Sequence, residues 1–143
     1  RVVKNGNVQT YMSLVEENLS KKYHTKPVHS SSEVELLQSR FPKNLQTLLV
    51  YQDDTFLGGT WLFSDNDFIH TQYLHFNDVG RDLCAAEFLV GYLMDSYPAK
   101  RYLSFGTSTE ANGMVLNEGL ASFKEGFGAS GFCHDFYRKE LCK

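Results

Sequence analysis

Two polar residues near the carboxyl end, Asn117 and Lys124, are seven positions apart in LNEGLASFKEGFG (116–128), a stretch that is typical of a helix. At about 100° per residue they share one flank of that helix, and Gly119 and Gly126 share the opposite flank. Each interior glycine costs roughly 1 kcal/mol relative to alanine, so two on one edge indicate close approach of another backbone or of a ligand. The alternative is tight packing of the helix on a sheet, with Lys124 reaching water along its aliphatic stem.

Two of the five histidines lie in FIHTQYLHF (68–76). A histidine with a pKa near neutrality can take a proton from an amine, so His70 or His75 is a candidate base, and a hydrogen-bonded structural role is the alternative for either. Strand alternation predicts two faces of mixed polarity, one with His70, Gln72 and Leu74 and the other with Ile69, Thr71, Tyr73 and His75.

A polar loop from Thr107 to Val115 lies between an expected strand and the helix at 116–128. Loops in that position often bind substrate, so Ser108 and Glu110 are candidates for contact with an acceptor. The alternative is a solvated connection in which Asn112 and Gly113 make the turn. The histidines show no i, i+4 pairing, so no metal site is expected.

Hydrophobic periodicity predicts the elements that must position these residues. Spacings of three and four predict helices at 8–24, 32–41 and 83–97, the second with a capping box of Ser32 and Glu35, and they place Leu116, Leu120, Phe123 and Phe127 on the buried side of the last helix. Aromatic and β-branched runs predict strands at 47–52, 56–64, 68–76, 102–106 and 131–139, with Trp61 in the core.

The order of these elements indicates an α+β fold with a mixed, mainly antiparallel sheet and helices on both faces. The first three strands form a meander, and the strand at 102–106 is reached through a helix, so it can lie parallel to 68–76 by a right-handed crossover. Where two such strands splay, their unpaired backbone groups can bind an extended ligand in place of a missing strand.

The composition indicates one globular domain over residues 1–143, expected to be a fragment or the C-terminal part of a longer protein because the first residue is Arg1. A net charge of −3 gives no basic footprint for DNA, and no apolar run is long enough for a membrane span. Three cysteines without paired spacing fit reduced thiols, which favours a cytoplasmic protein. A homodimer is compatible with these features.

Three stretches resemble the GNAT acyltransferase superfamily, and more closely its FemAB-like branch: KPVHSSSEVELLQSRFP, HTQYLHF and LSFGTSTEANGMVLNEGLASFKEGFGASG. The phrase GL-x-x-FK-x-x-FG is similar to one near the carboxyl end of the Fem-type aminoacyltransferases. The resemblance implies transfer of an acyl group to an amine, with the pantetheine of acetyl-CoA or another acyl-CoA between the strands at 68–76 and 102–106.

The resemblance also implies site residues. The backbone of residues 72–76, including Tyr73, Leu74 and Phe76, would hold the pantetheine, and the segment from Asn77 to Leu83, with Gly80 and Arg81, would hold the pyrophosphate. Phe123 stands where many GNAT enzymes have a proton-donating tyrosine. Lys124 would therefore stabilise the charge that develops during transfer, with Asn117 beside it.

Three hypotheses follow for function. The first is N-acyl transfer, expected from acetyl-CoA, to an amine of a small cell-envelope or polysaccharide precursor such as an amino sugar. The second is aminoacyl transfer from charged tRNA, which the acidic net charge disfavours. The third is a GNAT-like domain that binds a partner without catalysis.

Overall fold

The computed structural model describes residues 1–141, which form two compact units: Arg1–Gly106, and a second unit that begins at Thr107. The first unit contains five strands, β1 (Val2–Lys4), β2 (Leu45–Gln52), β3 (Thr55–Ser64), β4 (Phe68–Phe76) and β5 (Tyr102–Ser104). Its helices are α1 (Val8–Tyr23), α2 (Ser31–Arg40), α3 (Asp78–Asp82) and α4 (Ala85–Ser96).

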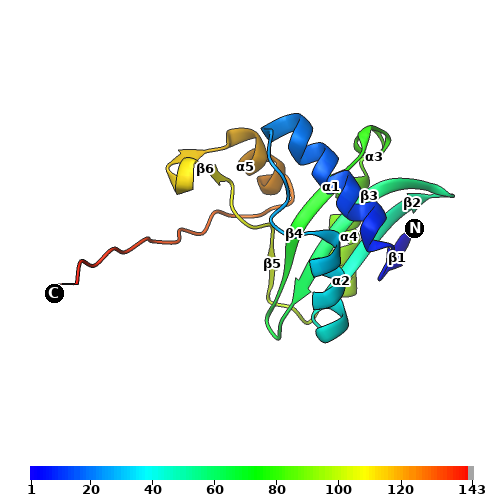
Figure 1. The fold of residues 1–143 in the computed structure, drawn as a ribbon, viewed down its shortest axis with the longest axis horizontal. Coiled ribbons are helices and arrows are strands. Elements are labelled where there is room, and N and C mark those ends of the chain that lie inside the picture. The colour runs from blue at the N-terminus through cyan, green and yellow to red at the C-terminus, as the bar shows by residue number, and fades with distance from the viewer. Residues whose placement is uncertain (142–143) are drawn as a thin grey trace. The chain divides into compact units, whose positions relative to one another are not determined.

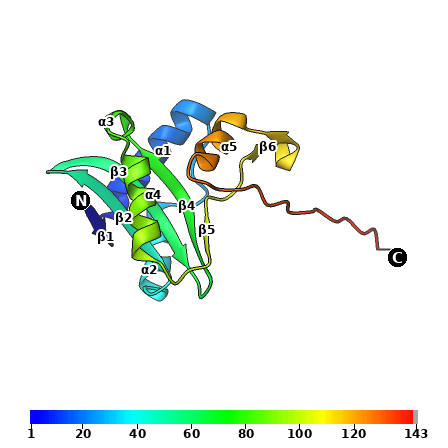
Figure 2. The same ribbon diagram turned by 180° about the vertical axis from the view of Figure 1, so that it is seen from behind.

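The strands of the first unit form one sheet in the order β1-β2-β3-β4-β5. Neighbouring strands run antiparallel except β4 and β5, which run parallel. Helices α1 and α2 cover one face of this sheet and α4 covers the other, as the two opposite views show (Figures 1 and 2). The predicted α+β fold, with a mixed and mainly antiparallel sheet between helices, is confirmed.

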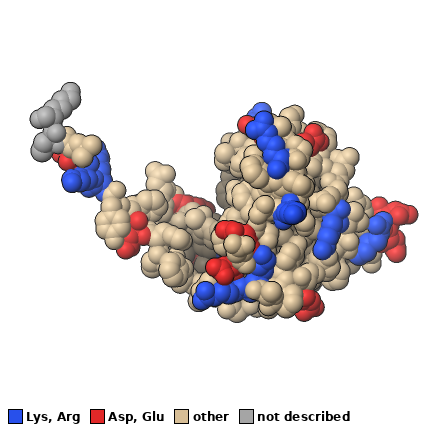
Figure 3. Space-filling view, turned by 90° about the horizontal axis from the view of Figure 1, so that it is seen from below, with Lys and Arg blue, Asp and Glu red and all other residues tan. Residues whose placement is uncertain are grey.

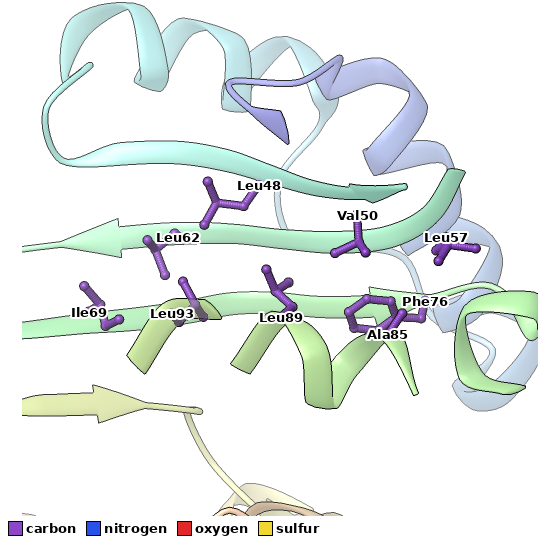
Figure 4. Close-up of a cluster of buried hydrophobic side chains, with 9 residues drawn as sticks. All are labelled: Leu48, Val50, Leu57, Leu62, Ile69, Phe76, Ala85, Leu89 and Leu93. Atoms are coloured by element: carbon purple, nitrogen blue, oxygen red, sulfur yellow. The ribbon is translucent and has the colours of Figure 1, made fainter. Parts of the chain in front are cut away.

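One part of the core lies between the sheet and α4 (Figure 4). Leu89 and Leu93 of α4 are fully buried there, because residues three to four positions apart share one face of a helix. They pack against side chains from three strands of the sheet: Leu48, Val50, Leu57, Leu62, Ile69 and Phe76.

The other part of the core lies under α1 and α2. Val8, Tyr11, Met12 and Val15 of α1 and Val34 of α2 pack there against Leu49, Trp61 and Tyr73 of the sheet. Trp61 is fully buried, as predicted.

A β-bulge at Gln72 changes which residues of β4 share a face. Tyr73 pairs with Trp61 and Thr71 with Leu62, which leaves Gln72 without an opposite residue on β3. Beyond the bulge the pleat is reversed, so Tyr73 packs under α1 and α2, whereas Leu74 packs with Ile69 on the α4 face. The strict alternation predicted for 68–76 is therefore wrong beyond residue 72.

Local hydrogen bonds fix the ends of the first two helices. Asn7 caps α1 by accepting from Thr10 N, and His24 ends it in the left-handed region, as the helix predicted for 8–24 requires. The capping box of α2 is formed by Ser30 and Glu33, two residues before the predicted pair, because Ser30 is the residue with extended backbone.

The helix predicted for 83–97 is present as α4, which begins two residues later, and a separate short helix, α3, precedes it. Asn77 caps the short α3, and Cys84, with a φ of 52°, separates it from α4. A left-handed residue cannot continue a right-handed helix, so the regular spacing begins at Ala85 and Leu83 is 47% exposed.

The second unit contains a small hairpin followed by a helix. Strands β6 (Thr109–Glu110) and β7 (Val115–Leu116) pair antiparallel around the 3-10 turn η1 (Ala111–Gly113), so the predicted loop has a regular structure of its own. Asn112 and Gly113 both have positive φ, which agrees with the predicted turn. Helix α5 (Glu118–Glu125) starts after Leu116, which belongs to β7.

Two predictions for the second unit are wrong. Leu116 and Leu120, predicted to lie on the buried side of the last helix, are 58% and 37% exposed. The helix begins later than predicted, and its buried residue is Lys124, which is 8% exposed. Residues 131–139 form no strand, since no described segment offers them a ladder of hydrogen bonds.

The burial of two leucines predicts different losses of stability when each is replaced by alanine. Leu89→Ala should lower the free energy of unfolding by about 2–5 kcal/mol, because the side chain is fully buried and its removal leaves a cavity. Leu36→Ala, the same change at a side chain that is 49% exposed on α2, should stay within about 0.5 kcal/mol. Urea unfolding of both variants measures this, and equal losses would contradict the assigned core.

Candidate functional site

The parallel ladder between β4 and β5 ends early and leaves one edge of β4 open. Pairing joins Phe68–His70 to Tyr102–Ser104, and among residues 1–141 no strand pairs with 71–76 on that side. Gly106 has a φ of +69°, and a Cβ there would lie 3.2 Å from His70 Cε1. The ladder ends because β5 ends at Ser104, and residues 71–76 of β4 keep backbone groups that an extended ligand can use.

Some backbone groups along this part of β4 already have partners within the unit. The carbonyl of Tyr73 accepts from the Tyr11 hydroxyl at 2.8 Å and from Thr60 Oγ1 at 2.6 Å. The carbonyl of Phe76 accepts from Asn18 Nδ2 at 2.9 Å and from the Arg81 guanidinium. Tyr73, Leu74 and Phe76 were predicted to hold pantetheine. The carbonyls of Tyr73 and Phe76 accept these side-chain hydrogen bonds, and the bonds named here do not involve the carbonyl of Leu74.

The segment predicted to hold the pyrophosphate is bonded to its own chain. Asn77 Oδ1 accepts from Gly80 N at 2.8 Å, and the Arg81 guanidinium also bonds the carboxylate of Asp78. A Cβ on Gly80 would lie 2.4 Å from the carbonyl oxygen of Leu57, so this glycine permits helix-to-strand packing. The edge of β4 keeps backbone groups that an extended chain could use, whereas the side chains of the segment after it bond to their own chain.

His70 lies where the ladder ends. Its Nδ1 is 2.9 Å from Ser104 Oγ on β5, and its ring is 6.1 Å from that of Phe63. Phe63 packs in the cluster under α1 and α2, so His70 lies on that face of the sheet.

His75 lies on the same face, with its ring 6.4 Å from that of Tyr73. Because of the bulge, the two histidines predicted for opposite faces share one. Burial, and then the positive charges of Arg81 and Lys22, lower the pKa of His75 to about 4. At neutral pH the ring is therefore uncharged but weakly basic, and an efficient base has a pKa near the working pH. This makes His75 a poor candidate for the base.

A polar group that the sequence analysis missed surrounds Tyr73. Its hydroxyl accepts from Val28 N at 3.1 Å and lies 3.0 Å from His29 Nδ1. It thereby holds the connection between α1 and α2 against β4. From the sequence, KPVHSSS (26–32) was predicted only to connect two helices. Nothing in its residue spacing indicates contact with Tyr73, which is 44 residues after His29.

The four residues singled out in the second unit lie together. Lys124 Nζ donates to Thr107 O at 2.6 Å and to Ser108 Oγ at 2.9 Å. Asn117 caps α5 by accepting from Leu120 N at 2.9 Å, and its Nδ2 donates to Glu110 Oε1 at 2.6 Å. Burial lowers the pKa of Lys124.

Within the described part of the second unit, no other segment lies close to the two glycines of α5. The nearest atom to a Cβ on Gly119 would be Asn117 Oδ1 at 3.8 Å. A Cβ on Gly126 would meet carbonyl oxygens of its own helix, because Gly126 is the residue that ends α5. The pair therefore marks the first turn and the end of a short helix.

Among residues 1–141 no group of three His, Cys, Asp or Glu could hold a metal ion. No described helix is long and apolar enough to cross a membrane. Basic and acidic side chains are interspersed on the face in Figure 3, which shows no basic stripe for nucleic acid.

Comparisons with solved structures identify the fold. A possible acetyltransferase from Clostridium difficile 630 matches with a TM-score of 0.69 and 9% identity, covering 100% of this chain and 98% of that one. The aminoglycoside N-acetyltransferase AAC(6')-Iy in complex with CoA matches with 0.63 and 11% identity over 99% and 96%. An aminoglycoside acetyltransferase from an uncultured soil metagenomic sample gives 0.61 and 15% over 99% and 98%.

The chain has a GNAT-like fold. Sequence comparisons add nothing to this, since no protein-family model matches the chain and no curated protein does.

The shifted pKa of His75 predicts how stability depends on pH. The unfolded state takes up a proton below about pH 6.5, and the folded state does so only near pH 4. Stability from this group is therefore fully present above pH 6.5 and is lost as the pH falls toward 4, by about 3 kcal/mol at most. Unfolding free energies across this range measure the slope, which His75→Gln should flatten. An NMR titration of the folded protein that places His75 near 6.5 would contradict the assignment.

The hydrogen bonds of Lys124 predict that this residue protects the amides of residues 107–110 from hydrogen exchange. Lys124→Met keeps the apolar stem and removes both hydrogen bonds, so amide exchange should become at least about tenfold faster at residues 107–110, because bonds to a charged donor contribute about 1.5–3 kcal/mol. Lys139→Met, the same change at an exposed lysine, should leave exchange there unchanged. Hydrogen exchange with mass spectrometry compares the two variants. Unchanged exchange in both would show that the hydrogen bonds of Lys124 do not stabilise residues 107–110.

Proposed function

We propose that this protein is an N-acyltransferase in which an acyl thioester, acetyl-CoA in the simplest case, lies along the open edge of β4. The observation that carries this proposal is the early end of the parallel ladder at His70 and Ser104, while β4 continues to Phe76. Pantetheine is an extended chain with two amide groups, and it can take the hydrogen bonds of a missing strand. The likeness to CoA-binding acetyltransferases supports the same choice of donor.

The acceptor in this proposal is a small molecule with an amino group. Several proteins of the same fold are named as aminoglycoside acetyltransferases, and their acceptors are sugars that bear amines. An amino sugar of a cell-envelope precursor has the same chemistry. The narrower placement in the FemAB-like branch rests on the residues of GL-x-x-FK-x-x-FG alone and stays a prediction, as does the tRNA alternative.

His70 is the base in this proposal. It lies at the point where the strands separate, and Ser104 Oγ at 2.9 Å from Nδ1 fixes the orientation of its ring. A neutral imidazole can take the proton of the attacking amine while the thiolate of the donor leaves. That Lys124 and Asn117 stabilise charge in this reaction stays a prediction. The rate at which the Lys124→Met variant releases CoA thiol, compared with that of the parent chain, would test it for Lys124.

Acetyl-CoA should raise the melting temperature, because a ligand at about 100 times its Kd stabilises the folded state by about 2.7 kcal/mol. Millimolar acetyl-CoA without any shift would overturn the donor assignment. A shift with no release of free CoA thiol across a panel of amino sugars and aminoglycosides would favour the binding domain without catalysis.

The two histidines provide a matched pair for the chemical step. His70→Gln should lower turnover by about 10²–10⁴-fold, the usual contribution of a general base, with acetyl-CoA affinity retained. His75→Gln, the same change on the same strand face, should keep turnover within a few-fold of the parent chain. The reverse order of effects would transfer the role to His75.

A further inference from the structure

The carbonyl oxygen of Tyr73 accepts hydrogen bonds from two buried hydroxyl groups of other elements. Tyr11 of α1 donates to it at 2.8 Å and Thr60 of β3 at 2.6 Å, and both residues are fully buried. A carbonyl oxygen has two lone pairs, so the two bonds together fix the direction of the C=O group. The bulge beside Tyr73 disrupts the ladder between β3 and β4, which gives side-chain hydroxyls access to this oxygen.

These bonds show that the Tyr73 carbonyl points toward β3. The Tyr11 hydroxyl is also 3.2 Å from Gly59 O on β3, so it lies between the two strands. Burial raises the pKa of Tyr11, so the hydroxyl keeps its proton at neutral pH and can donate. The direction of this carbonyl is therefore set by groups that are shielded from water.

The same peptide group carries the N–H of Leu74. In a planar trans peptide the C=O and the following N–H point in opposite directions, so the Leu74 N–H is directed away from β3. The sheet order places β3 and β5 on opposite sides of β4, so this N–H faces the open edge (Figure 1). The N–H and C=O of one residue in an antiparallel ladder point to the same side, so Leu74 presents both groups there.

The position of Leu74 along β4 indicates which part of an extended donor it would meet. Leu74 is four residues beyond His70, a separation of roughly 10–13 Å in a strand. The reacting carbonyl has to lie near the base, so the donor would reach Leu74 with an amide of its pantetheine arm. The carbonyl of Phe76, the next residue that faces this edge, already accepts from Asn18 and Arg81.

We propose that Tyr11 and Thr60 are positioning residues for the acyl donor, which act through the peptide group between Tyr73 and Leu74 and do not touch the donor. This inference rests on the proposed function and adds a register to it, in which one pantetheine amide pairs with the N–H and C=O of Leu74. Backbone groups that are already oriented lose less entropy when a ligand binds, so the two hydroxyls should increase the affinity for the donor.

Calorimetric titration with acetyl-CoA tests the two hydroxyls. Tyr11→Phe and Thr60→Val each remove one hydroxyl and keep nearly the same side-chain shape, and each should raise the Kd by about three- to tenfold. Thr60→Ser keeps the hydroxyl and should have the Kd of the parent chain. Thr47→Val is the matched control, because Thr47 is equally buried on β2 but donates to Gln38 Oε1.

The Leu74 amide provides a spectroscopic test. Its proton resonance should move downfield when acetyl-CoA is added to the parent chain, because the amide gains a hydrogen bond, and Tyr11→Phe and Thr60→Val should reduce this shift. A parent chain that does not bind acetyl-CoA overturns the proposed function and this inference with it. Three results overturn this inference alone: binding with an unmoved Leu74 resonance, an unchanged Kd in both hydroxyl variants, or an equal rise in Kd for Thr47→Val.

Discussion

The early end of one parallel ladder is the constraint on which the candidate site depends. β4 continues for six residues beyond its last pair with β5, because β5 ends at Ser104. A longer β5 would satisfy the edge of β4 from within the sheet and leave no backbone groups for a ligand. In this fold a binding site is thus created by hydrogen bonds that the sheet does not make.

The bulge at Gln72 has a second effect, because one extra residue reverses the pleat of β4. Tyr73 then points toward α1 and α2, where its hydroxyl holds the connection between these helices through Val28 and His29. The same reversal brings His70 and His75 to one face. Their environments differ, since burial and two positive charges keep the pKa of His75 near 4. One irregularity in one strand thereby sets both the shape and the protonation of this face.

Several polar residues that are attractive in the sequence serve the scaffold. Asn77 and Asn117 are helix caps, Gly80 permits α3 to approach Leu57, and Arg81 bonds the end of β4. A side chain that already satisfies its own backbone is less available to a ligand, because an incoming group must replace those bonds. This is why the backbone edge of β4 carries the proposed function.

The sequence by itself determined the fold class, the meander, the ends of α1 and the parallel placement of β5, because hydrophobic period and turn residues are local signals. It failed where distant contacts decide. The bulge at Gln72 and the burial of Lys124 depend on neighbours in other elements. The strand predicted for residues 131–139 has the right local pattern but no partner among the described residues. Local pattern can specify an extended backbone, but only tertiary or quaternary contacts can supply its hydrogen bonds.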